Sequence, residues 1–146
     1  MSPLEIREAP IEEVVKVNAT IVEFDEAYPK EYFEERYIWK EALIIVAYRE
    51  WQAAGYVVWY DRYQDGSFYC RMAWVDPNFR KKWILTALMD YQNIRAKNKW
   101  YNKIKIKTRN SRRQMLSFLV KEGYLFTGVV EAADITDNGI YLEKSI

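Results

Sequence analysis

The apolar pattern of this chain changes from strand-like to helical at Asp76-Pro77, and that change restricts the folds open to it. Before it, residues 42–48, 52–60 and 67–75 form three consecutive strand-like runs, the first of them continuously apolar. Asp65-Gly66 is typical of a turn between the last two runs. After it, residues 80–98 carry apolar side chains at three- and four-residue steps, at Ile84, Ala87, Leu88, Tyr91 and Ile94. The sequence therefore predicts an antiparallel meander followed directly by a helix.

The remaining segments complete an alternating order of strands and helices. The patterns predict a strand at 4–9, helices at 11–26 and 30–40, a strand at 101–108, a helix at 111–122 and strands at 124–131 and 140–144. In the helix at 111–122 we expect Met115, Phe118 and Leu119 to point inward. The order β-α-α-β-β-β-α-β-α-β-β predicts one α/β (α+β) domain over residues 1–146, with a central mixed, largely antiparallel sheet flanked by helices. A length of 146 residues, half of them hydrophobic, suits a single core.

Several classes of protein are excluded by what the sequence lacks. It contains no histidine, so Ser-His-Asp and Cys-His nucleophile systems and histidine metal sites cannot form within one chain, and we expect no metal cofactor. Its one cysteine, Cys70, cannot form an internal disulfide, and on an alternating strand it is more typical of a small buried hydrophobe than of an acyl carrier. The longest apolar run, residues 42–47, is too short for a membrane span, and we find no secretory signal. We therefore expect a cytoplasmic protein.

Charge is distributed unevenly although the net charge is only +1. Residues 80–113 contain twelve Lys or Arg and one acid, whereas the rest of the chain contains ten Lys or Arg and twenty acids. Lys103, Lys105 and Lys107 alternate with Ile104 and Ile106, so they would share one face of a strand. This basic half could hold the phosphates of a cofactor or of nucleic acid, or it could simply be a solvated surface.

Three motifs, in order and on the expected elements, resemble the GNAT acyltransferase superfamily. They are MAWVDPNFR at 72–80 with TALM at 86–89, KEGY at 121–124, and DNGIYLEK at 137–144. The resemblance extends over nearly the whole chain. It implies that the protein uses acetyl-CoA or another acyl-CoA and acylates an amine.

The resemblance also implies where the cofactor binds. The pantetheine arm would add to the strand at 67–75 like an extra strand, and the pyrophosphate would meet the backbone N–H groups and positive dipole end of the following helix. The implied cofactor-binding residues are those around this corner and one arginine further on: Val75, Arg80, Lys81, Lys82, Trp83, Ile84, Leu85, Thr86 and Arg112.

The sequence departs from the family pattern at this loop. Lys81, Trp83 and Leu85 stand where glycines are usual; the lysine favours anions, whereas the tryptophan would either obstruct the pyrophosphate or fold into the core. We expect Trp83 and Leu85 to be ordinary packing residues of the helix. No carboxylate occurs in 67–75, and Leu119 stands where the family often has a proton-donating tyrosine, so no catalytic residue is assigned.

Three functions therefore remain open. The first is an active acyl-CoA N-acyltransferase that relies on proximity and on a strand-bulge N–H for the oxyanion. The second is a GNAT-fold protein without catalysis that binds a protein partner. The stretch 79–91 and Phe118-Leu119 resemble short GNAT-like proteins carried inside the virions of tailed phages, which would make it virion-associated. The third is a nucleic-acid binder that uses 80–113, with Trp83, Trp100 and Tyr101 as stacking residues. A homo-oligomer is compatible with all three.

Overall fold

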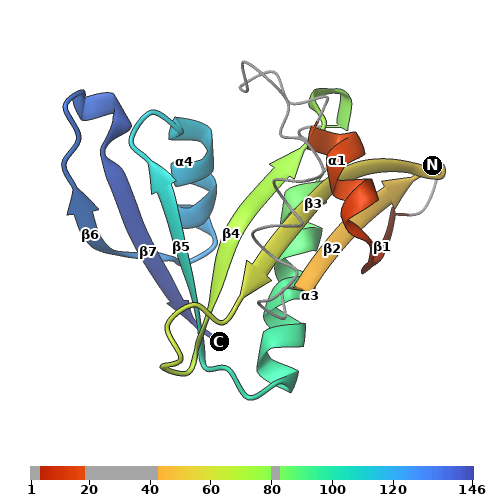
Figure 1. Ribbon diagram of the computed structural model, residues 1–146, viewed down its shortest axis with the longest axis horizontal. Coiled ribbons are helices and arrows are strands. Elements are labelled where there is room, and N and C mark those ends of the chain that lie inside the picture. The colour runs from red at the N-terminus through yellow and green to blue at the C-terminus, as the bar shows by residue number, and fades with distance from the viewer. Residues whose placement is uncertain (1–3, 19–42, 80–82) are drawn as a thin grey trace.

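In the described part of the chain, seven strands form one sheet in the order β1-β2-β3-β4-β5-β7-β6 (Figure 1). The computed structural model of the protein describes residues 4–18, 43–79 and 83–146. Within these ranges the elements are β1 (Leu4–Glu8), α1 (Ile11–Asn18), β2 (Leu43–Arg49), β3 (Gln52–Tyr60), β4 (Ser67–Val75), α3 (Ile84–Asn98), β5 (Lys103–Arg109), α4 (Arg113–Lys121), β6 (Leu125–Val130) and β7 (Gly139–Ser145), with 3-10 turns at Pro77–Phe79 and Ile135–Asp137.

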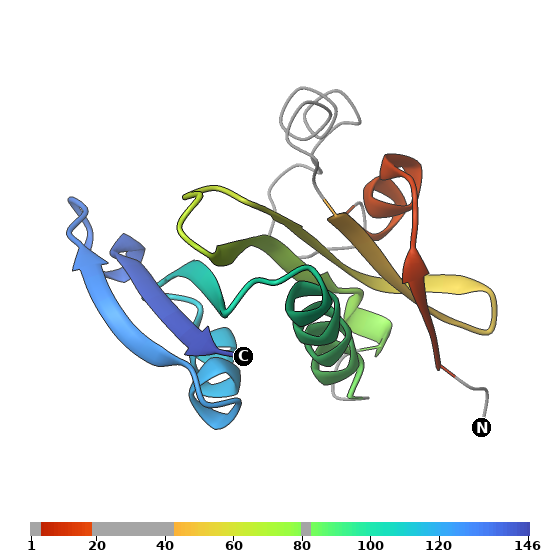
Figure 2. The same cartoon turned by 90° about the horizontal axis from the view of Figure 1, so that it is seen from below.

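The predicted architecture is confirmed. Neighbouring strands pair antiparallel except β4 and β5, which are parallel, so the sheet is mixed and largely antiparallel. Figure 2 shows α1 on one face of this sheet and both α3 and α4 on the other. The predicted helix at 30–40 and residues 19–26 of the first predicted helix lie outside the described residues.

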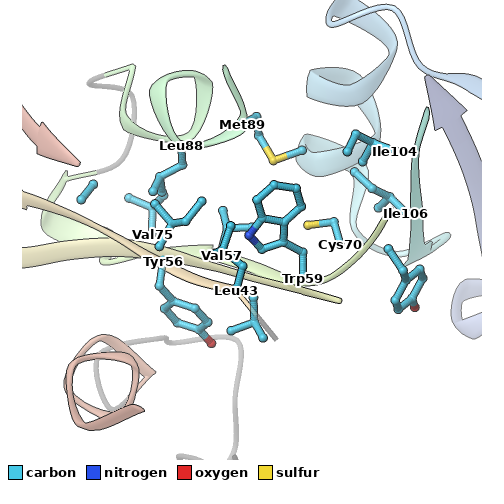
Figure 3. Close-up of a cluster of buried hydrophobic side chains, with 14 of the residues drawn as sticks. Leu43, Tyr56, Val57, Trp59, Cys70, Val75, Leu88, Met89, Ile104 and Ile106 are labelled. Atoms are coloured by element: carbon cyan, nitrogen blue, oxygen red, sulfur yellow. The ribbon is translucent and has the colours of Figure 1, made fainter. Parts of the chain in front are cut away.

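The meander forms the most deeply buried part of the sheet. Seven consecutive residues of β3, Ala54–Tyr60, are buried, as are five of the seven residues of β2. Strands covered on both faces need apolar side chains on both, which explains why the run at 42–48 does not alternate. Figure 3 shows Trp59 of β3 at the centre of the core, between α3 and the residues of β4 and β5.

The buried faces of the two helices on the far side of the sheet differ in part from the predicted ones. The buried residues of α3 are Ile84, Leu88, Met89, Gln92 and Ala96. The assignment of Ile94 to its apolar face was wrong: this side chain is 62% exposed, because it lies on the side of the helix turned away from those residues. In α4, Leu119 is buried as expected and Met115 and Phe118 are half-buried, while the buried Leu116 was not predicted.

Gly55 sets how closely α3 approaches the sheet. A Cβ atom placed on Gly55 of β3 would lie 3.0 Å from the Trp74 carbonyl oxygen, 3.1 Å from Cγ2 of Val75 and 3.2 Å from Cδ1 of Leu88. Close-packed interiors absorb such contacts only by shifting neighbours. The absence of a side chain at Gly55 therefore lets Leu88 of α3 reach the last residues of β4.

We predict that Gly55→Ala lowers the free energy of unfolding by about 1–3 kcal/mol, the usual cost of overpacking a core. Gly128→Ala is the matched control, because a Cβ on Gly128 of β6 meets no atom within 4 Å. Urea denaturation followed by circular dichroism measures both. Equal stability of the two variants would show that the close approach at Gly55 carries no energetic weight.

Candidate functional site

The sheet opens where β4 and β5 stop pairing. Their parallel ladder joins Ser67–Cys70 to Lys103–Ile106 and ends there, and Figure 1 shows the two strands diverging beyond it. On its other side β4 contains a bulge, since Val58 pairs with Met72 and the next residue, Trp59, pairs with Cys70. Arg71 is therefore the extra residue, and bulges of this kind bend a strand and end pairing. We call residues 71–75 and 107–109 the β4–β5 divergence.

A buried acid turns the chain at the end of β4. The Asp76 N–H donates to the carbonyl oxygen of Ala54 at 2.8 Å, and the Asp76 carboxylate accepts from the N–H of Asn78 at 2.8 Å. Asp76 is only 2% exposed, and the preceding Val75 is buried as well. The sequence analysis selected Val75 for the site but missed Asp76, whose Asp-Pro-Asn context is typical of an Asx turn.

The start of α3 presents backbone donors. The first hydrogen bond of the helix runs from the Ala87 N–H to the Trp83 carbonyl oxygen at 3.1 Å, so the N–H groups of Ile84, Leu85 and Thr86 have no acceptor within the helix. No side chain at the N-cap accepts from them. Together with the helix dipole, such N–H groups favour a bound anion.

Trp83 does not pack as expected. It occupies the N-cap position with φ 63°, a left-handed conformation that favours glycine, and its side chain is 80% exposed. The expectation that Trp83 is an ordinary packing residue of the helix was therefore wrong, whereas Leu85 is partly buried against the core as predicted. The backbone keeps a glycine-like conformation at a position where the resembled family has glycine.

The other predicted cofactor residues differ in exposure, and three of them are not described by the structure. Ile84 is 1% exposed, so only its backbone can meet a ligand, while Thr86 is half-buried on the same first turn. Arg80, Lys81 and Lys82 lie outside the described residues.

Arg112 connects the two sides of the β4–β5 divergence. It precedes α4, and its guanidinium carbon lies 5.1 Å from the ring centroid of Trp74, which belongs to β4. A cation–π contact at this distance is attractive. The structure thus brings Arg112 to the same opening as Val75, and Trp74 is a partner that the sequence analysis did not identify.

Two groups that could move a proton or carry an acyl group are held inert by burial. Burial raises the pKa of the Cys70 thiol to about 12, and Figure 3 shows Cys70 beside Trp59 in the core. Burial also raises the pKa of Tyr124, whose hydroxyl has no hydrogen-bond partner among the described residues. Leu119, at the family's usual tyrosine position, is fully buried and confirmed as a core residue. Near neutral pH, Cys70 therefore stays a neutral thiol rather than a thiolate. The raised pKa of Tyr124 makes its hydroxyl a weaker acid than that of an ordinary tyrosine.

Two further kinds of site are absent from the described part of the chain. Among residues 4–18, 43–79 and 83–146, no group of three or more Cys, Asp or Glu side chains is arranged to hold a metal ion. No helix in the same ranges is long and apolar enough to cross a bilayer.

The lysine stripe of β5 is partly neutralised. Ile104 and Ile106 are buried, so the three lysines share the opposite face as predicted. Lys105 lies 2.8 Å from the carboxylate of Asp65, an ion pair that raises the pKa of Lys105 and lowers that of Asp65. Lys103 lies 3.5 Å from Glu143.

Together these features define a class of fold. A mixed sheet that opens beside a bulged strand, with a helix N-terminus at the end of that strand, is similar to the acyl-CoA-binding fold expected from the sequence motifs. The chain belongs to the acetyltransferase (GNAT) family, which it matches over residues 15–124.

Solved structures agree with this assignment. Ard1 from Thermoplasma volcanium is 17% identical, with a TM-score of 0.81 over 98% of this chain and 97% of that one. The ribosomal-protein-S18-alanine N-acetyltransferase from Escherichia coli is 10% identical, with a TM-score of 0.83 over 99% and 94% of the two chains. PaiA N-acetyltransferase from Thermoplasma acidophilum, in complex with coenzyme A, is 17% identical, with a TM-score of 0.74 over 99% of both chains. No curated protein matches the sequence.

We predict that native Cys70 resists alkylation. With its pKa raised to about 12, the thiolate fraction should still rise tenfold per pH unit between pH 7 and pH 10 without a plateau, and burial should keep the rate low throughout. Iodoacetamide labelling followed by mass spectrometry, with urea-unfolded protein as the control, measures this. A fast native reaction with a plateau below pH 9 would instead identify an activated thiol.

We also predict that Trp83→Gly stabilises the protein. The left-handed conformation costs a non-glycine residue about 1–2 kcal/mol, which glycine does not lose. Glycine also loses more conformational entropy on folding than other residues, and this offsets about 0.5–1 kcal/mol of the gain. A net gain of about 0.5–1 kcal/mol is expected in chemical denaturation. Trp100→Gly should gain as much, because Trp100 is also almost fully exposed with φ 72°. A loss of stability in Trp83→Gly alone would show that the indole makes stabilising contacts.

Proposed function

We propose that this protein binds an acyl-CoA, acetyl-CoA being the first to test, and transfers the acyl group to an amine. The observation that carries the proposal is the β4–β5 divergence, which begins at a bulge and ends at an uncapped helix start. The structural neighbours support it, since they include proteins named as N-acetyltransferases and one is a coenzyme A complex.

The described residues fit such a cofactor from one end of the opening to the other. The pantetheine arm would lie along β4 between the bulge and Val75, as an added strand does. The pyrophosphate would accept from the N–H groups of Ile84, Leu85 and Thr86, with Arg80, Lys81 and Lys82 supplying charge from the preceding segment of the sequence. Arg112, already at the opening, adds a further cation.

The chemistry asked of the protein is modest. The amine nitrogen would attack the thioester carbonyl carbon, the carbonyl oxygen would gain negative charge, and the carbon–sulfur bond would then break. CoA would leave as the thiolate, and the proton lost by the amine nitrogen would pass to water. The bulge at Arg71 supports the proposal, because a backbone N–H released from the ladder there would donate to that oxyanion. Orientation of the two reactants would supply most of the remaining acceleration. We assign no side chain as acid or base.

A second candidate is a GNAT-fold protein that binds a partner without catalysis. Trp83 favours it, because a large indole stands where the resembled family has glycine for close phosphate approach. Leucine at position 119 also leaves this position without a proton donor, and the hydroxyl of Tyr124 is buried. A role inside a phage virion would be one form of this candidate, and a cytoplasmic location fits either candidate.

Nucleic-acid binding is a weaker third candidate. Trp83 and Trp100 are both exposed, but they flank the 15-residue α3. A helix of that length places them roughly 20 Å apart, too far to stack on neighbouring bases. Two of the three stripe lysines are also engaged with carboxylates.

The deciding experiment is calorimetric titration of acetyl-CoA into the folded protein at low salt, with CoA and 3′,5′-ADP as comparison ligands. We expect one site per chain with a low-micromolar dissociation constant. No binding up to millimolar acetyl-CoA would contradict the proposal and favour the non-catalytic candidate.

A matched pair of variants locates the binding site. We predict that Trp83→Gly tightens acetyl-CoA binding by about tenfold, equivalent to ~1.4 kcal/mol, because it keeps every N–H group and removes the obstructing indole. Trp100→Gly relieves the same backbone conformation at the other end of α3 and should leave the affinity unchanged. Equal effects in the two variants would mean that the ligand does not bind at the start of α3.

A further inference from the structure

The two edges of the sheet are built very differently. β1 forms one edge and has the charged sequence LEIRE, in which Arg7 pairs with Glu5 at 3.2 Å and Glu8 pairs with Arg95 of α3. Charges on an edge strand prevent unwanted pairing with another chain. β6 forms the opposite edge, visible at the left of Figure 1, and its sequence LFTGVV has no charge and no proline.

β6 exposes its apolar side chains on both faces. All six of its residues are exposed, and its four large apolar side chains, Leu125, Phe126, Val129 and Val130, are between 53% and 70% exposed. A short, uncharged apolar strand at a sheet edge is a template for pairing with further backbone. The composition of β6 therefore favours pairing with another strand, whereas the charged composition of β1 opposes it.

A bulge makes β6 self-complementary. Its register against β7 shifts between Phe126 and Gly128, so that Phe126 faces Leu142 and Val129 faces Ile140. Because residues 140 and 142 share one face of β7, the bulge places Phe126 and Val129 on one face of β6. Leu125, opposite Glu143, and Val130, opposite Gly139, share the other face.

An antiparallel two-fold axis between Thr127 and Gly128 would match these faces. Leu125 of one copy would lie opposite Val130 of the other, and Phe126 opposite Val129, so every large apolar residue of the strand would gain an apolar neighbour.

The charges around β6 are complementary in the same arrangement. Lys144 of β7 lies beside the start of β6, with its Nζ atom 5.8 Å from the centroid of the Tyr124 ring, and exposed Lys121 precedes the strand. Of the two acids at this end, Glu122 and Glu143, the second is paired with Lys103. Glu131, Asp134 and Asp137, all exposed, follow the end of β6, where Lys107 and Arg109 of β5 also lie. The acids outnumber the cations at this end, so an antiparallel pair brings the more basic start of each strand to the more acidic end of the other.

We propose that β6 is an interface at which two copies of this chain pair antiparallel, edge to edge, into one continuous sheet. The interface lies at the far end of the sheet from β1 and uses none of the residues placed in the acyl-CoA site. It therefore stands independently of the proposed function.

The first test is the mass of the protein in solution, measured by size-exclusion chromatography with light scattering across a concentration series. We expect twice the chain mass of 17.6 kDa for the native protein and the single-chain mass for Val129→Lys, which places a charge opposite Phe126 of the partner copy. Val120→Lys is the matched control, because Val120 is an exposed valine on α4 and should leave the dimer intact. A native monomer at every concentration, or a Val129→Lys dimer, would overturn the proposal.

The second test fixes the register. Chains carrying Phe126→Cys and chains carrying Val129→Cys are mixed under mild oxidation, with the native Cys70 buried in both. The proposed register sets residue 126 opposite residue 129 of the partner, whereas two copies of residue 126 would be about 10 Å apart along the strands. We expect disulfide-linked dimers in the mixture and not in either variant alone. Cross-linking that is equally fast in the separate variants would rule out this register.

Discussion

Four residue pairs hold the two halves of this sheet together. Ser67–Cys70 of β4 and Lys103–Ile106 of β5 form the only parallel ladder among the described strands, and it joins the meander to the β5–β7–β6 half. Aromatic packing reinforces it: the Phe68 ring lies 4.2 Å from that of Trp59 and 4.5 Å from that of Tyr101, centroid to centroid. A longer ladder would close the β4–β5 divergence, and a shorter one would leave two poorly connected sheets.

The residue before α3, Trp83, has the left-handed backbone conformation that is usual for glycine, although it is not glycine. Trp83 has a left-handed conformation, as do Trp51 and Trp100, and all three are exposed. Anion binding at a helix start depends on N–H groups rather than on side chains. The substitution of glycine therefore changes the access of a ligand to this helix start more than it changes the donors that would bind it.

Much of the fold followed from local pattern. The predicted strands at 52–60 and 67–75 coincide with β3 and β4, because long apolar runs bounded by turn residues leave few alternatives. The three family motifs also identified the corner at Val75 and the helix start as the candidate site. Ile94 was misassigned because helical spacing alone does not reveal how wide the covered face of a helix is.

The sequence by itself determined the order of the elements, the family and the uneven distribution of charge, since these depend on residue type and spacing along the chain. Only the tertiary structure decided where β4 leaves β5, that Arg112 reaches Trp74, that Trp83 faces solvent and that two stripe lysines pair with Glu143 and Asp65. Each of these joins or separates residues distant in the chain. Their geometry depends on how whole strands and helices pack, and no local pattern specifies that packing.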